Sequence, residues 1–572
     1  MLRYRCRQDN IVTKNSVCPV CGNRSELERS DIYWCENCNV PLYETVCGCC
    51  GSEGYRITTD IRPVFPQERL LLELIWNKPP KTYEKSSIWN CSGNYYFIDG
   101  KRIRFSVKDL KNLDVEKIRQ RYFKEEPKID ETYFNGFIEK FVCANQSRYD
   151  DIVKEATDYI RKATKGYTIR DMFVSFSGGK DSTVTSDIVM RALSDTKILH
   201  IFGDTTLEFP ETLKYVERFQ REHPKTPVLS SKNKDKDFEE LCRLVGPPSR
   251  VMRWCCTVFK TGAIQRKIKM LFRNKNKILT FYGIRRNESK SRSKYERETE
   301  GTKITKQITI SPIIDWMDFD VWLYILTTGI DFNRAYRLGY ARVGCWCCPN
   351  NSGWSEFLSK IHMREQSERF HKMLIDFAVK IGKPDPDVYV QDGKWKARQG
   401  GNGVDYAKMT AVSFEPCALE ENTFNYQLSR PISEALYELF KPFGYLNFDL
   451  GNRRLGEVYI TGKNGELILK LQGRIGSNTL KVTILDFHID GAKNVNAAEE
   501  KVKCQITKYQ MCIACGACES ICRHNAIIIK ENNDGTVNYQ ILENKCLRCL
   551  ECVNHFTGGC YIRKVLATKK DR

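Results

Sequence analysis

The chain has 572 residues, a formal net charge of +20, and a composition that is 41% hydrophobic and 28% charged. This composition is typical of a globular, soluble chain and excludes a fibrous or disordered one, and the length predicts roughly three or four domains. The start lacks the apolar run of a signal peptide, and the longest apolar stretch, residues 69–76, is too short to cross a bilayer. We therefore expect a cytoplasmic protein with no membrane partner.

Cysteine is unusually frequent, with 26 cysteines against 7 histidines. In a reducing compartment, cysteines at short spacings indicate metal binding rather than disulfides, and thiolates select zinc and iron–sulfur clusters. The cysteines fall mainly within residues 1–50, 242–348 and 504–560. The outer groups predict two small metal-binding modules, whereas the middle group lies inside an α/β pattern.

Residues 1–55 contain too few apolar side chains to form a core alone, so we predict a zinc-ribbon-like module that a metal organises. One structural zinc is expected on four thiolates spaced C-x₂-C-x₈-C-x₂-C, namely Cys35, Cys38, Cys47 and Cys50. In an alternative site, Cys18 and Cys21 pair with Cys35 and Cys38. A second metal that uses Cys6 or Cys49 stays open. No long-period repeat stands out along the chain.

Residues 56–150 predict a small α+β region. The stretch 95–105 predicts a hairpin whose Asp99-Gly100 pair suits a type I′ turn. A charged helical stretch follows over 107–125.

Residues 151–383 alternate strand and helix patterns. Strands are expected at 171–176, 197–202, 278–284 and 308–314, helices at 182–193 and 210–220, and one long helix at 354–380. This alternation predicts an α/β domain with a parallel twisted sheet covered on both faces. Residues 384–410 are expected to form a loop or linker, and 411–500 a small α+β domain with a hairpin about Asn464-Gly465.

The segment "FVSFSGGKDST" (173–183) joins a strand to a helix and predicts a phosphate loop. Its glycines let the backbone approach an anion, and the following helix presents free N–H groups and the positive end of its dipole. The G-x-x-x-x-G-K spacing of a Walker A loop is absent. The nucleotide-binding residues are expected to be Ser177, Gly178, Gly179, Lys180, Asp181 and Ser182.

This loop resembles the SGGxDS pyrophosphate loop of the ATP pyrophosphatases, which have the adenine-nucleotide α-hydrolase fold. Residues 202–212 and 311–325 resemble two segments of the phosphoadenosine phosphosulfate (PAPS) reductase family, and the first implies that Asp204 faces the nucleotide. Residues 282–292 resemble that family's arginine segment, which implies that Arg285 and Arg286 meet phosphate or sulfate oxygens. The resemblance covers about residues 170–350. It implies ATP or a related adenine nucleotide as ligand, together with Mg²⁺.

Two adjacent cysteines, Cys255 and Cys256, precede a C-x-x-C pair formed by Cys345 and Cys348. A disulfide between neighbours is strained. The pattern resembles that of assimilatory adenylylsulfate (APS) reductases, which implies one [4Fe–4S] cluster on these four thiolates; a zinc ion on the same ligands is the alternative. Cys347 lies between the outer ligands and is either a packing residue or a catalytic thiol that carries sulfur.

Residues 501–572 resemble a bacterial two-cluster ferredoxin domain, although Arg523 replaces the expected proline and the last cysteine gap is longer. The resemblance implies that the fourth cysteine of each run binds the other cluster. One [4Fe–4S] cluster then takes Cys512, Cys515, Cys518 and Cys560. The other takes Cys522, Cys546, Cys549 and Cys552. Such a domain is an inlet for electrons from an external donor, and it brings the expected total to three [4Fe–4S] clusters and zinc.

Two enzymatic functions compete. In the first, which is similar to tRNA thiolation and DNA phosphorothioation, ATP activates an acceptor, pyrophosphate leaves, and a sulfur species displaces AMP; Lys180, Arg285 and Arg286 act in catalysis. The net charge of +20 suits a nucleic-acid acceptor, and a desulfurase is a further expected partner as sulfur donor.

In the second, an APS or PAPS reductase forms sulfite. That family carries an E-C-G-like tail motif, which is absent here; Cys417 is a poor match. A third hypothesis is a non-enzymatic iron–sulfur redox sensor that binds nucleic acid.

Overall fold

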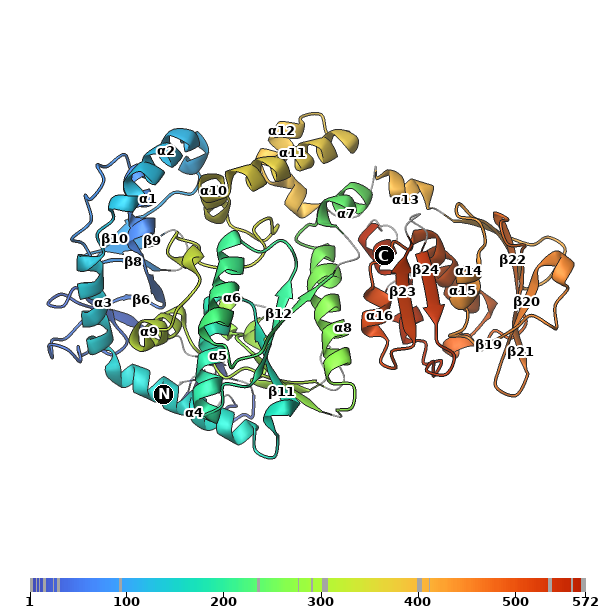
Figure 1. The fold of residues 1–572 in the computed structure, drawn as a ribbon, viewed down its shortest axis with the longest axis horizontal. Coiled ribbons are helices and arrows are strands. Elements are labelled where there is room, and N and C mark those ends of the chain that lie inside the picture. Colours follow the sequence, from blue (N-terminus) through green and yellow to red (C-terminus); the bar gives the residue numbers. More distant parts are fainter. Residues whose placement is uncertain are drawn as a thin grey trace. The chain divides into compact units, whose positions relative to one another are not determined.

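The computed structural model describes residues 4–566 except 7, 10, 14–16, 24, 28–30, 92–94, 234–236, 276, 290–291, 301–306, 399–403, 411, 533–536 and 557–558. The chain forms two compact units (Figure 1). The first contains Met1–Gly203, Leu207–Ser230 and Phe272–Glu368, and the second contains Asp204–Thr206, Ser231–Leu271 and Arg369–Arg572. Among the described helices, none has the length and apolarity that a membrane crossing requires.

A six-stranded sheet with the order β13-β12-β11-β14-β16-β15 organises the α/β region. The pairs β11/β12, β11/β14 and β14/β16 are parallel, and β15 pairs antiparallel with β16 at one edge. The strands are β11 (Met172–Phe176), β12 (Leu199–Asp204), β13 (Val228–Lys232), β14 (Ile278–Tyr282), β15 (Glu298–Glu300) and β16 (Gln307–Ile310). The predicted α/β class with a parallel sheet is confirmed.

The central strands are buried on both faces, as the sequence predicts for a parallel sheet. Four of the five residues of β11 and four of the five of β14 are buried, although successive side chains point to opposite faces. One core joins these strands to the helices α4 (Gln146–Ala163), α5 (Lys180–Leu193), α6 (Pro210–Glu222) and α9 (Asp318–Thr328).

The single long helix expected over 354–380 is wrong. The chain forms α10 (Gly353–His362) and α11 (Arg364–Lys380), because Met363 between them has a non-helical backbone, with φ −136° and ψ 49°. The Met363 side chain is buried in the core that includes Phe357 and Leu358. Packing of this side chain therefore overrides the helical pattern of the sequence.

The region before the α/β sheet contains a four-stranded sheet with the order β10-β9-β8-β7. Its strands are β7 (Ile61–Pro63), β8 (Ile88–Cys91), β9 (Tyr95–Ile98) and β10 (Lys101–Arg104), and its neighbours are α1 (Pro66–Ile75) and α3 (Thr132–Ala144). The predicted hairpin is confirmed: Asp99 and Gly100 both have positive φ, +48° and +77°, as a type I′ turn requires.

The charged stretch 107–125 is not one helix. A 3₁₀ turn at Asp109–Asn112 is followed by α2 (Val115–Glu125), and the Asp114 carboxylate accepts a hydrogen bond from the Lys117 N–H at the start of α2. Asp114 therefore caps a new helix, which the charge pattern alone did not reveal.

The N-terminal residues form two three-stranded sheets with the orders β2-β1-β3 and β5-β4-β6. Their strands are β1 (Tyr4–Arg5), β2 (Val12–Thr13), β3 (Glu26–Leu27), β4 (Ile32–Cys35), β5 (Val40–Leu42) and β6 (Tyr55–Thr58).

In the second unit, a six-stranded antiparallel sheet has the order β17-β18-β22-β21-β20-β19. Its strands are β17 (Ser413–Pro416), β18 (Thr423–Gln427), β19 (Tyr445–Asn447), β20 (Glu457–Thr461), β21 (Leu467–Gln472) and β22 (Thr479–Ile484). The expected hairpin between β20 and β21 is confirmed, with Gly465 at φ +87°. A single core joins this sheet to α14 (Glu434–Glu438), α15 (Val495–Met511), β23 (Ile527–Glu531) and β24 (Val537–Ile541).

The remaining helices of the second unit are short. They are α7 (Phe238–Val245), a π-helical turn at Cys256–Thr261, α8 (Gly262–Leu271), α12 (Pro386–Gln391), α13 (Asp405–Met409), α16 (Ala517–Ile521), α17 (Glu551–Asn554) and α18 (Tyr561–Leu566). The stretch 384–410, expected to be a loop, thus contains α12 and α13; its residues 399–403 lie outside the described part.

Candidate functional site

The loop that joins β11 to α5 carries the predicted phosphate-binding residues. Gly178 has φ +68°, and a Cβ there would lie 2.8 Å from Thr212 Cγ2, so the backbone conformation and the close approach both require glycine. The Ser182 hydroxyl donates to the Gly179 carbonyl at 2.9 Å and accepts the Ser177 N–H at 3.1 Å. These bonds hold the loop against the first turn of α5, where the free N–H groups of a helix attract an anion.

Four charged side chains form an ion network at the same end of the sheet. The Lys180 ammonium lies 3.1 Å from Asp181 Oδ2 and 3.1 Å from Asp318 Oδ1. Arg285 donates from Nε to Asp181 Oδ1 at 2.6 Å and from NH2 to Asp318 Oδ1 at 2.7 Å. Two cations thus alternate with two carboxylates, and the Lys180 and Arg285 side chains are each only 4% exposed.

The network keeps its charges despite burial. Burial raises the pKa of Asp318, but the Lys180 and Arg285 cations outweigh it, so that the pKa falls below its ordinary value. The pKa of Asp181 is lowered in the same way, since Arg285 and Lys180 overcome the effect of burial. Burial lowers the pKa of Lys180, but Asp181 and Asp318 together raise it above its ordinary value. All four groups stay ionised and their charges cancel.

A further carboxylate, Asp60, ties this network to the start of α9. It accepts hydrogen bonds from the backbone N–H groups of Asp318 and Phe319, each at 3.0 Å. Burial and the nearby charge of Asp318 raise the pKa of Asp60 to about 7. Asp60 therefore positions Asp318 by bonding to its backbone.

Tyr336 and Asn333 support the glycine loop from the side. The Lys180 N–H donates to the Tyr336 hydroxyl at 2.9 Å, and Asn333 Nδ2 donates to the Gly178 carbonyl at 3.0 Å. Gly283, which follows β14, approaches the first turn of α5 so closely that a Cβ there would lie 2.6 Å from the Asp181 carbonyl carbon and oxygen. The glycine before the two arginines thus lets Arg285 reach the loop.

Arg285 and Arg286 have different surroundings. Arg286 pairs with Asp315, donates from Nε to the Tyr295 carbonyl at 2.9 Å, and is not part of the Lys180 network. Burial lowers the pKa of Arg292, and the cations Arg342 and Arg285 lower it further, while Asp181 opposes them. Arg292, which pairs with Glu288, and Arg342 therefore lie near the network.

Asp204, which the sequence predicts to face the nucleotide, is the last residue of β12. Its carboxylate accepts a hydrogen bond from the Thr206 N–H at 2.8 Å.

The C-x-x-C pair lies on a loop of the first unit just after Arg342. Cys345 forms an isolated antiparallel bridge with Glu208, and the Trp346 N–H donates to the Leu207 carbonyl at 3.0 Å. Asn351 Nδ2 donates to the Trp346 carbonyl at 2.7 Å. Cys347 is buried, at 6% exposure, whereas Cys345 and Cys348 are half-buried.

Comparison with known families gives a single matching domain. Residues 171–351 match the phosphoadenosine phosphosulfate reductase domain. This segment contains the glycine loop, the Lys180 network and the C-x-x-C loop. Residues 171–351 are therefore the part of the chain that is similar to PAPS reductases.

Relatives extend this result beyond the domain. Two uncharacterised proteins of Methanocaldococcus jannaschii are 30% identical over 292 residues and 31% identical over 297 residues, which is 50% and 51% of this chain. The chain spans 66% and 60% of their lengths, which is less than two thirds. An adenosine 5'-phosphosulfate reductase of a Geobacillus strain is 28% identical over 208 residues, covering 35% of this chain and 82% of that protein. The crystal structure of the PAPS reductase of Candida auris matches 36% of this chain and 97% of its own, with 19% identity and a TM-score of 0.27.

The adjacent cysteines belong to the second unit, whereas the C-x-x-C loop belongs to the first. The shared site of Cys255, Cys256, Cys345 and Cys348 therefore stays a prediction. Cys255 is buried and directly precedes the π-helical turn, a helix type frequent at functional sites.

Tyr561 links the adjacent cysteines to the C-terminal cysteine module within the second unit. Burial raises the pKa of Tyr561 to about 12, a hydrogen bond to Thr257 lowers it, and Cys515, Cys255 and Cys256 all contribute to the rise. The basic α8 packs on the module as well: Lys269 Nζ donates to the Glu519 carbonyl at 3.0 Å.

The structure brings together the first predicted set of ferredoxin thiols. Burial raises the pKa of Cys512 to about 12, and the neighbouring thiols of Cys560 and Cys518 contribute. Burial likewise raises the pKa of Cys515 well above its ordinary value, with contributions from Cys518, Cys560 and Cys512. Thiols that raise one another's pKa in this way cannot all ionise alone, whereas bound iron would supply the positive charge that four thiolates need, so this donor set fits a cluster.

The second predicted set lines one small cavity. Cys522, Cys546, Cys549 and Cys552 all face it, beside Pro442 and Leu547. Burial raises the pKa of Cys552 to about 12, helped by Cys518, Cys522 and Cys546, while Lys508 opposes it. Lys508 is almost completely buried, donates to the Cys552 carbonyl at 2.6 Å, and also lowers the pKa of Cys560. One buried cation thus lies beside both thiol sets.

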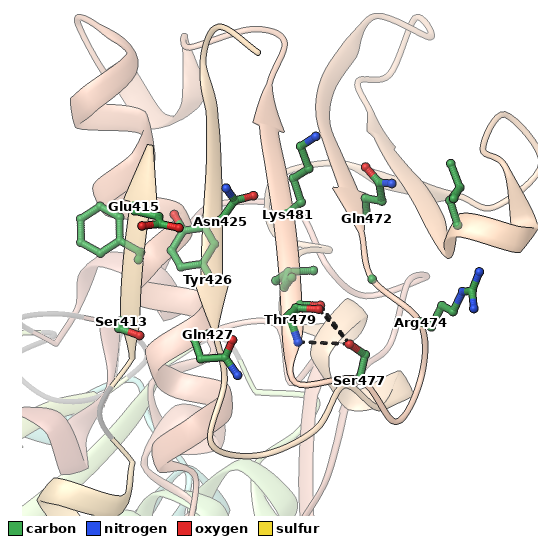
Figure 2. A pocket seen from close by; sticks show the side chains of 14 residues that line it. Ser413, Glu415, Asn425, Tyr426, Gln427, Gln472, Arg474, Ser477, Thr479 and Lys481 are labelled. Carbon is green, nitrogen blue, oxygen red and sulfur yellow. Dashed lines mark hydrogen bonds between the residues drawn. The ribbon is translucent and has the colours of Figure 1, made fainter. Parts of the chain in front are cut away.

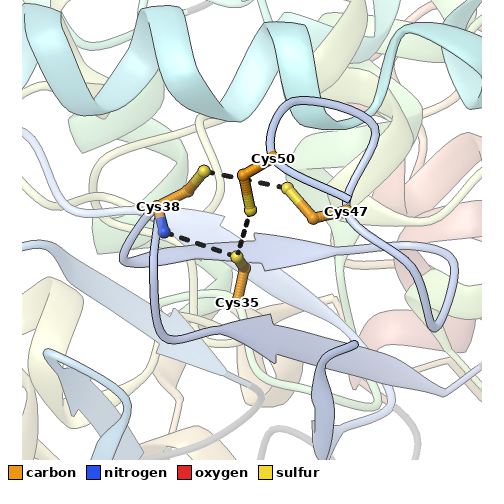
Figure 3. Close-up of side chains that lie close together, drawn as sticks. All are labelled: Cys35, Cys38, Cys47 and Cys50. Atoms are coloured by element: carbon orange, nitrogen blue, oxygen red, sulfur yellow. Dashed lines mark hydrogen bonds between the residues drawn. The ribbon is translucent and has the colours of Figure 1, made fainter. Parts of the chain in front are cut away.

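Near the N-terminus, the ligand atoms of Cys35, Cys38, Cys47 and Cys50 all lie within 4.8 Å of one another (Figure 3). The Cys35 and Cys50 sulfurs are 3.5 Å apart, and those of Cys47 and Cys38 are 3.8 Å apart. Four thiols that converge in this way fit a structural zinc. Cys18 and Cys21 lie in a different group, with Cys6 and Asp9, so the alternative pairing with Cys35 and Cys38 is not the grouping that the structure shows.

A hollow of about 600 Å³ lies on the antiparallel sheet of the second unit (Figure 2). None of its lining residues belongs to the segment that matches the PAPS reductase domain. Arg474 and Lys481 line it together with the half-exposed ring of Phe414, over which Lys503 Nζ lies 3.5 Å from the ring centroid.

Sequence patterns missed several residues of the nucleotide site. Asp318, Asp60, Tyr336 and Asn333 all contact the loop or its ion network. Asp318 lies inside the family-like segment 311–325, so the motif itself held that signal. Asp60 lies 258 residues from its partner in the chain, and no local pattern marks it.

Proposed function

We propose that this protein is a PAPS-reductase-family enzyme of sulfur metabolism that binds ATP at residues 177–182, releases pyrophosphate and transfers sulfur to an acceptor. The observation that carries the proposal is the Lys180 ammonium, which is buried at the N-terminus of α5 between Asp181 and Asp318. A cation at this place, with the positive end of the helix dipole, suits the negative charge of a departing pyrophosphate.

In this mechanism the acceptor's oxygen attacks the α-phosphorus of ATP, and the bond from that phosphorus to the bridging oxygen breaks. The electron pair of that bond leaves with pyrophosphate, which the glycine loop and Lys180 hold. A sulfur nucleophile then displaces AMP from the acceptor. Arg285 holds Asp181 and Asp318 in place, and these two carboxylates offer the oxygen ligands that Mg²⁺ prefers.

Three [4Fe–4S] clusters would supply one-electron chemistry when bound. For the two ferredoxin-like clusters, support comes from the burial and mutual approach of the thiols of Cys512, Cys515, Cys518 and Cys560, and from the common cavity of Cys522, Cys546, Cys549 and Cys552. For the third, on Cys255, Cys256, Cys345 and Cys348, support comes from the spacing of these cysteines, which resembles that of the APS reductases. Electrons would enter from an external donor, and a desulfurase would supply sulfur. Zinc would occupy the site of Cys35 and its three partners.

A second candidate is an APS or PAPS reductase that forms sulfite. It is favoured by the APS reductase relatives, such as the Geobacillus protein with 28% identity. The two candidates share the fold, the nucleotide and the clusters, and they differ in the products that leave.

Turnover by the air-free full chain separates them. We expect pyrophosphate and AMP from ATP in the presence of sulfide and an acceptor, and no sulfite from APS or PAPS. Sulfite from APS or PAPS, without pyrophosphate from ATP, would establish the reductase instead. If neither ATP nor APS or PAPS is turned over, the redox sensor is the hypothesis that remains. The variant Cys347→Ser tests the sulfur-carrier role: loss of turnover with unchanged iron content supports it, and full activity rejects it.

The hollow on the antiparallel sheet suits a nucleic-acid acceptor, because exposed aromatic rings stack on bases and cations pair with phosphates. Anisotropy with a labelled single-stranded oligonucleotide measures this. We expect the double variant Arg474→Ala, Lys481→Ala to weaken binding and to reduce the slope of log affinity against log salt by about two. An unchanged slope would show that the hollow does not bind the oligonucleotide.

A further inference from the structure

The two N-terminal ribbons are copies of one another, shifted by 29 residues, although the sequence shows no obvious repeat. In the first ribbon Tyr4 pairs with Thr13 and Leu27. In the second, Tyr33 pairs with Leu42 and Arg56. Each partner is displaced by the same 29 positions, so the strand order and the register are both repeated.

The turns that carry the cysteines repeat with the same offset. Cys18 N–H donates to the Asn23 carbonyl at 2.8 Å, and Cys47 N–H donates to the Ser52 carbonyl at 2.9 Å. Gly22 and Gly51 close these turns with φ +69° and +74°. Both turns therefore have the backbone of a C-x₂-C-G knuckle.

The metal-ligating groups repeat as well, with one change of chemistry. The sulfurs of Cys6 and Cys21 are 3.5 Å apart, as are those of Cys35 and Cys50. Asp9 takes the position of Cys38: the N–H of each donates to the sulfur of the preceding cysteine at 3.4 Å.

The Asp9 carboxylate faces the thiols of its own ribbon. Its Oδ2 accepts from Cys18 at 3.0 Å and from Cys6 at 3.3 Å. The ligand atoms of Cys6, Asp9, Cys18 and Cys21 all lie within 4.8 Å of one another. Three sulfurs and one oxygen at this separation supply the four ligands that a structural zinc ion takes.

The two ribbons differ in sequence at two positions of the repeated register. In the second copy Trp34 and Leu42 are buried in a core with Phe141, but the equivalent residues of the first copy are Arg5 and Thr13. A small ribbon with polar residues at such positions depends more strongly on a metal to hold it.

We propose that Cys6, Asp9, Cys18 and Cys21 bind a second zinc ion, in the first of two tandem copies of one ribbon. The site is independent of the proposed nucleotide chemistry. Its oxygen ligand makes it the weaker of the two zinc sites, because thiolates are the softer ligands that zinc prefers.

Zinc content of the full chain, measured by mass spectrometry separately from iron, tests the proposal. We expect about two zinc ions per chain, about one in Asp9→Ala, and about two in Asp9→Cys. Release of one zinc to a chelator should be faster than release of the other in the natural protein, and Asp9→Cys should slow the fast phase at least tenfold.

Cys35→Ser is the matched variant in the second ribbon, and it should lose the slowly released ion. Two zinc ions retained in Asp9→Ala, or a single ion in the natural protein that only Cys35→Ser removes, would overturn the proposal. Iron in place of the second zinc would overturn the choice of metal. Because Asp9 lies outside the core that holds the second ribbon, Asp9→Ala should leave the melting temperature of the chain unchanged.

Discussion

Asp60 shows how one carboxylate couples folding to pH. Its pKa rises to about 7 in the folded chain from an ordinary value of 3.8. Between these two values the unfolded chain has released a proton that the folded chain still holds. The contribution of Asp60 to the free energy of unfolding therefore falls as pH rises through this window and levels off above it.

We expect Asp60→Asn to remove this pH dependence, since asparagine does not titrate and its single side-chain oxygen can still accept one of the two N–H groups of Asp318 and Phe319. The melting temperature of the variant, relative to the natural chain, should rise between about pH 4 and about pH 7. Asp195→Asn is the control, because Asp195 only accepts the nearby Lys197 N–H. A difference that stays constant with pH would contradict the raised pKa.

The single guanidinium group of Arg285 pairs with two carboxylates, those of Asp181 and Asp318. Arg285→Met leaves Asp181 and Asp318 with Lys180 as their shared cation, and loss of a buried partner costs about 3–5 kcal/mol in the free energy of unfolding. Arg218→Met breaks the more exposed pair with Asp331 and should cost at most about 1 kcal/mol. Denaturant midpoints measure both, and equal effects would show that the network contributes no special stability.

For single residues, sequence motifs predict the site residues that are neighbours in the chain. They miss site residues that lie far away in the sequence and reach the site only through folding. Lys180, Asp181 and Ser182 follow from one short segment. Arg286 directly follows Arg285 and has the same side chain, yet it pairs with Asp315 outside the network. Which of two adjacent arginines enters the site depends on where the backbone turns after β14, and a spacing pattern does not encode that.

The contact between β14 and α5 is the element-scale feature on which the site depends. A Cβ on Gly283 would lie 2.6 Å from the Asp181 backbone. We expect Gly283→Ala to displace the first turn of α5 and to weaken nucleotide binding at least tenfold by calorimetry.

Gly136→Ala is its matched control in α3, where no atom lies within 4 Å of the new Cβ. That change should leave binding intact and stabilise the chain by about 0.5–1 kcal/mol, because alanine favours a helix interior. Normal binding by Gly283→Ala would mean that the approach of the two elements is not required.

Elements with strong local signals were predicted well. The strands β11, β12, β14 and β16 and the helices α5 and α6 follow hydrophobic patterns, and both hairpins follow their Asn-Gly or Asp-Gly turns. The edge strands β13 and β15 and the helices α7 and α8 were not predicted. The break at Met363 was missed because burial of its side chain, in the core that includes Phe357 and Leu358, overrides the helical pattern. The ribbon repeat was missed because the copies share backbone geometry and cysteine positions while their apolar residues differ.

At the scale of the whole molecule, the C-terminal cysteine module is not a loose appendage. Gln510 Oε1 accepts from the Ser429 N–H at 2.9 Å, and Tyr426 donates to Glu499 at 2.8 Å. The helix α15, Val495–Met511, runs across the predicted boundary at residue 501. Tests of the clusters therefore belong in the full chain.

Single cysteine variants of the full chain test the two ferredoxin-like clusters. We expect Cys515→Ser and Cys549→Ser each to lower the iron content by about four atoms per chain, and the double variant by about eight. Cys417→Ser, outside both thiol sets, should change nothing. If neither variant changes the iron content, the C-terminal module does not bind these clusters.

The central claim is that the buried Lys180 ammonium stabilises pyrophosphate as it leaves ATP. Pyrophosphate release from ATP by the air-free full chain, compared between Lys180→Met and the exposed control Lys197→Met, tests it most directly. The account predicts a loss of at least about 100-fold for Lys180→Met and no change for Lys197→Met. Equal release by the two variants, or no release by the natural protein while APS yields sulfite, would contradict it.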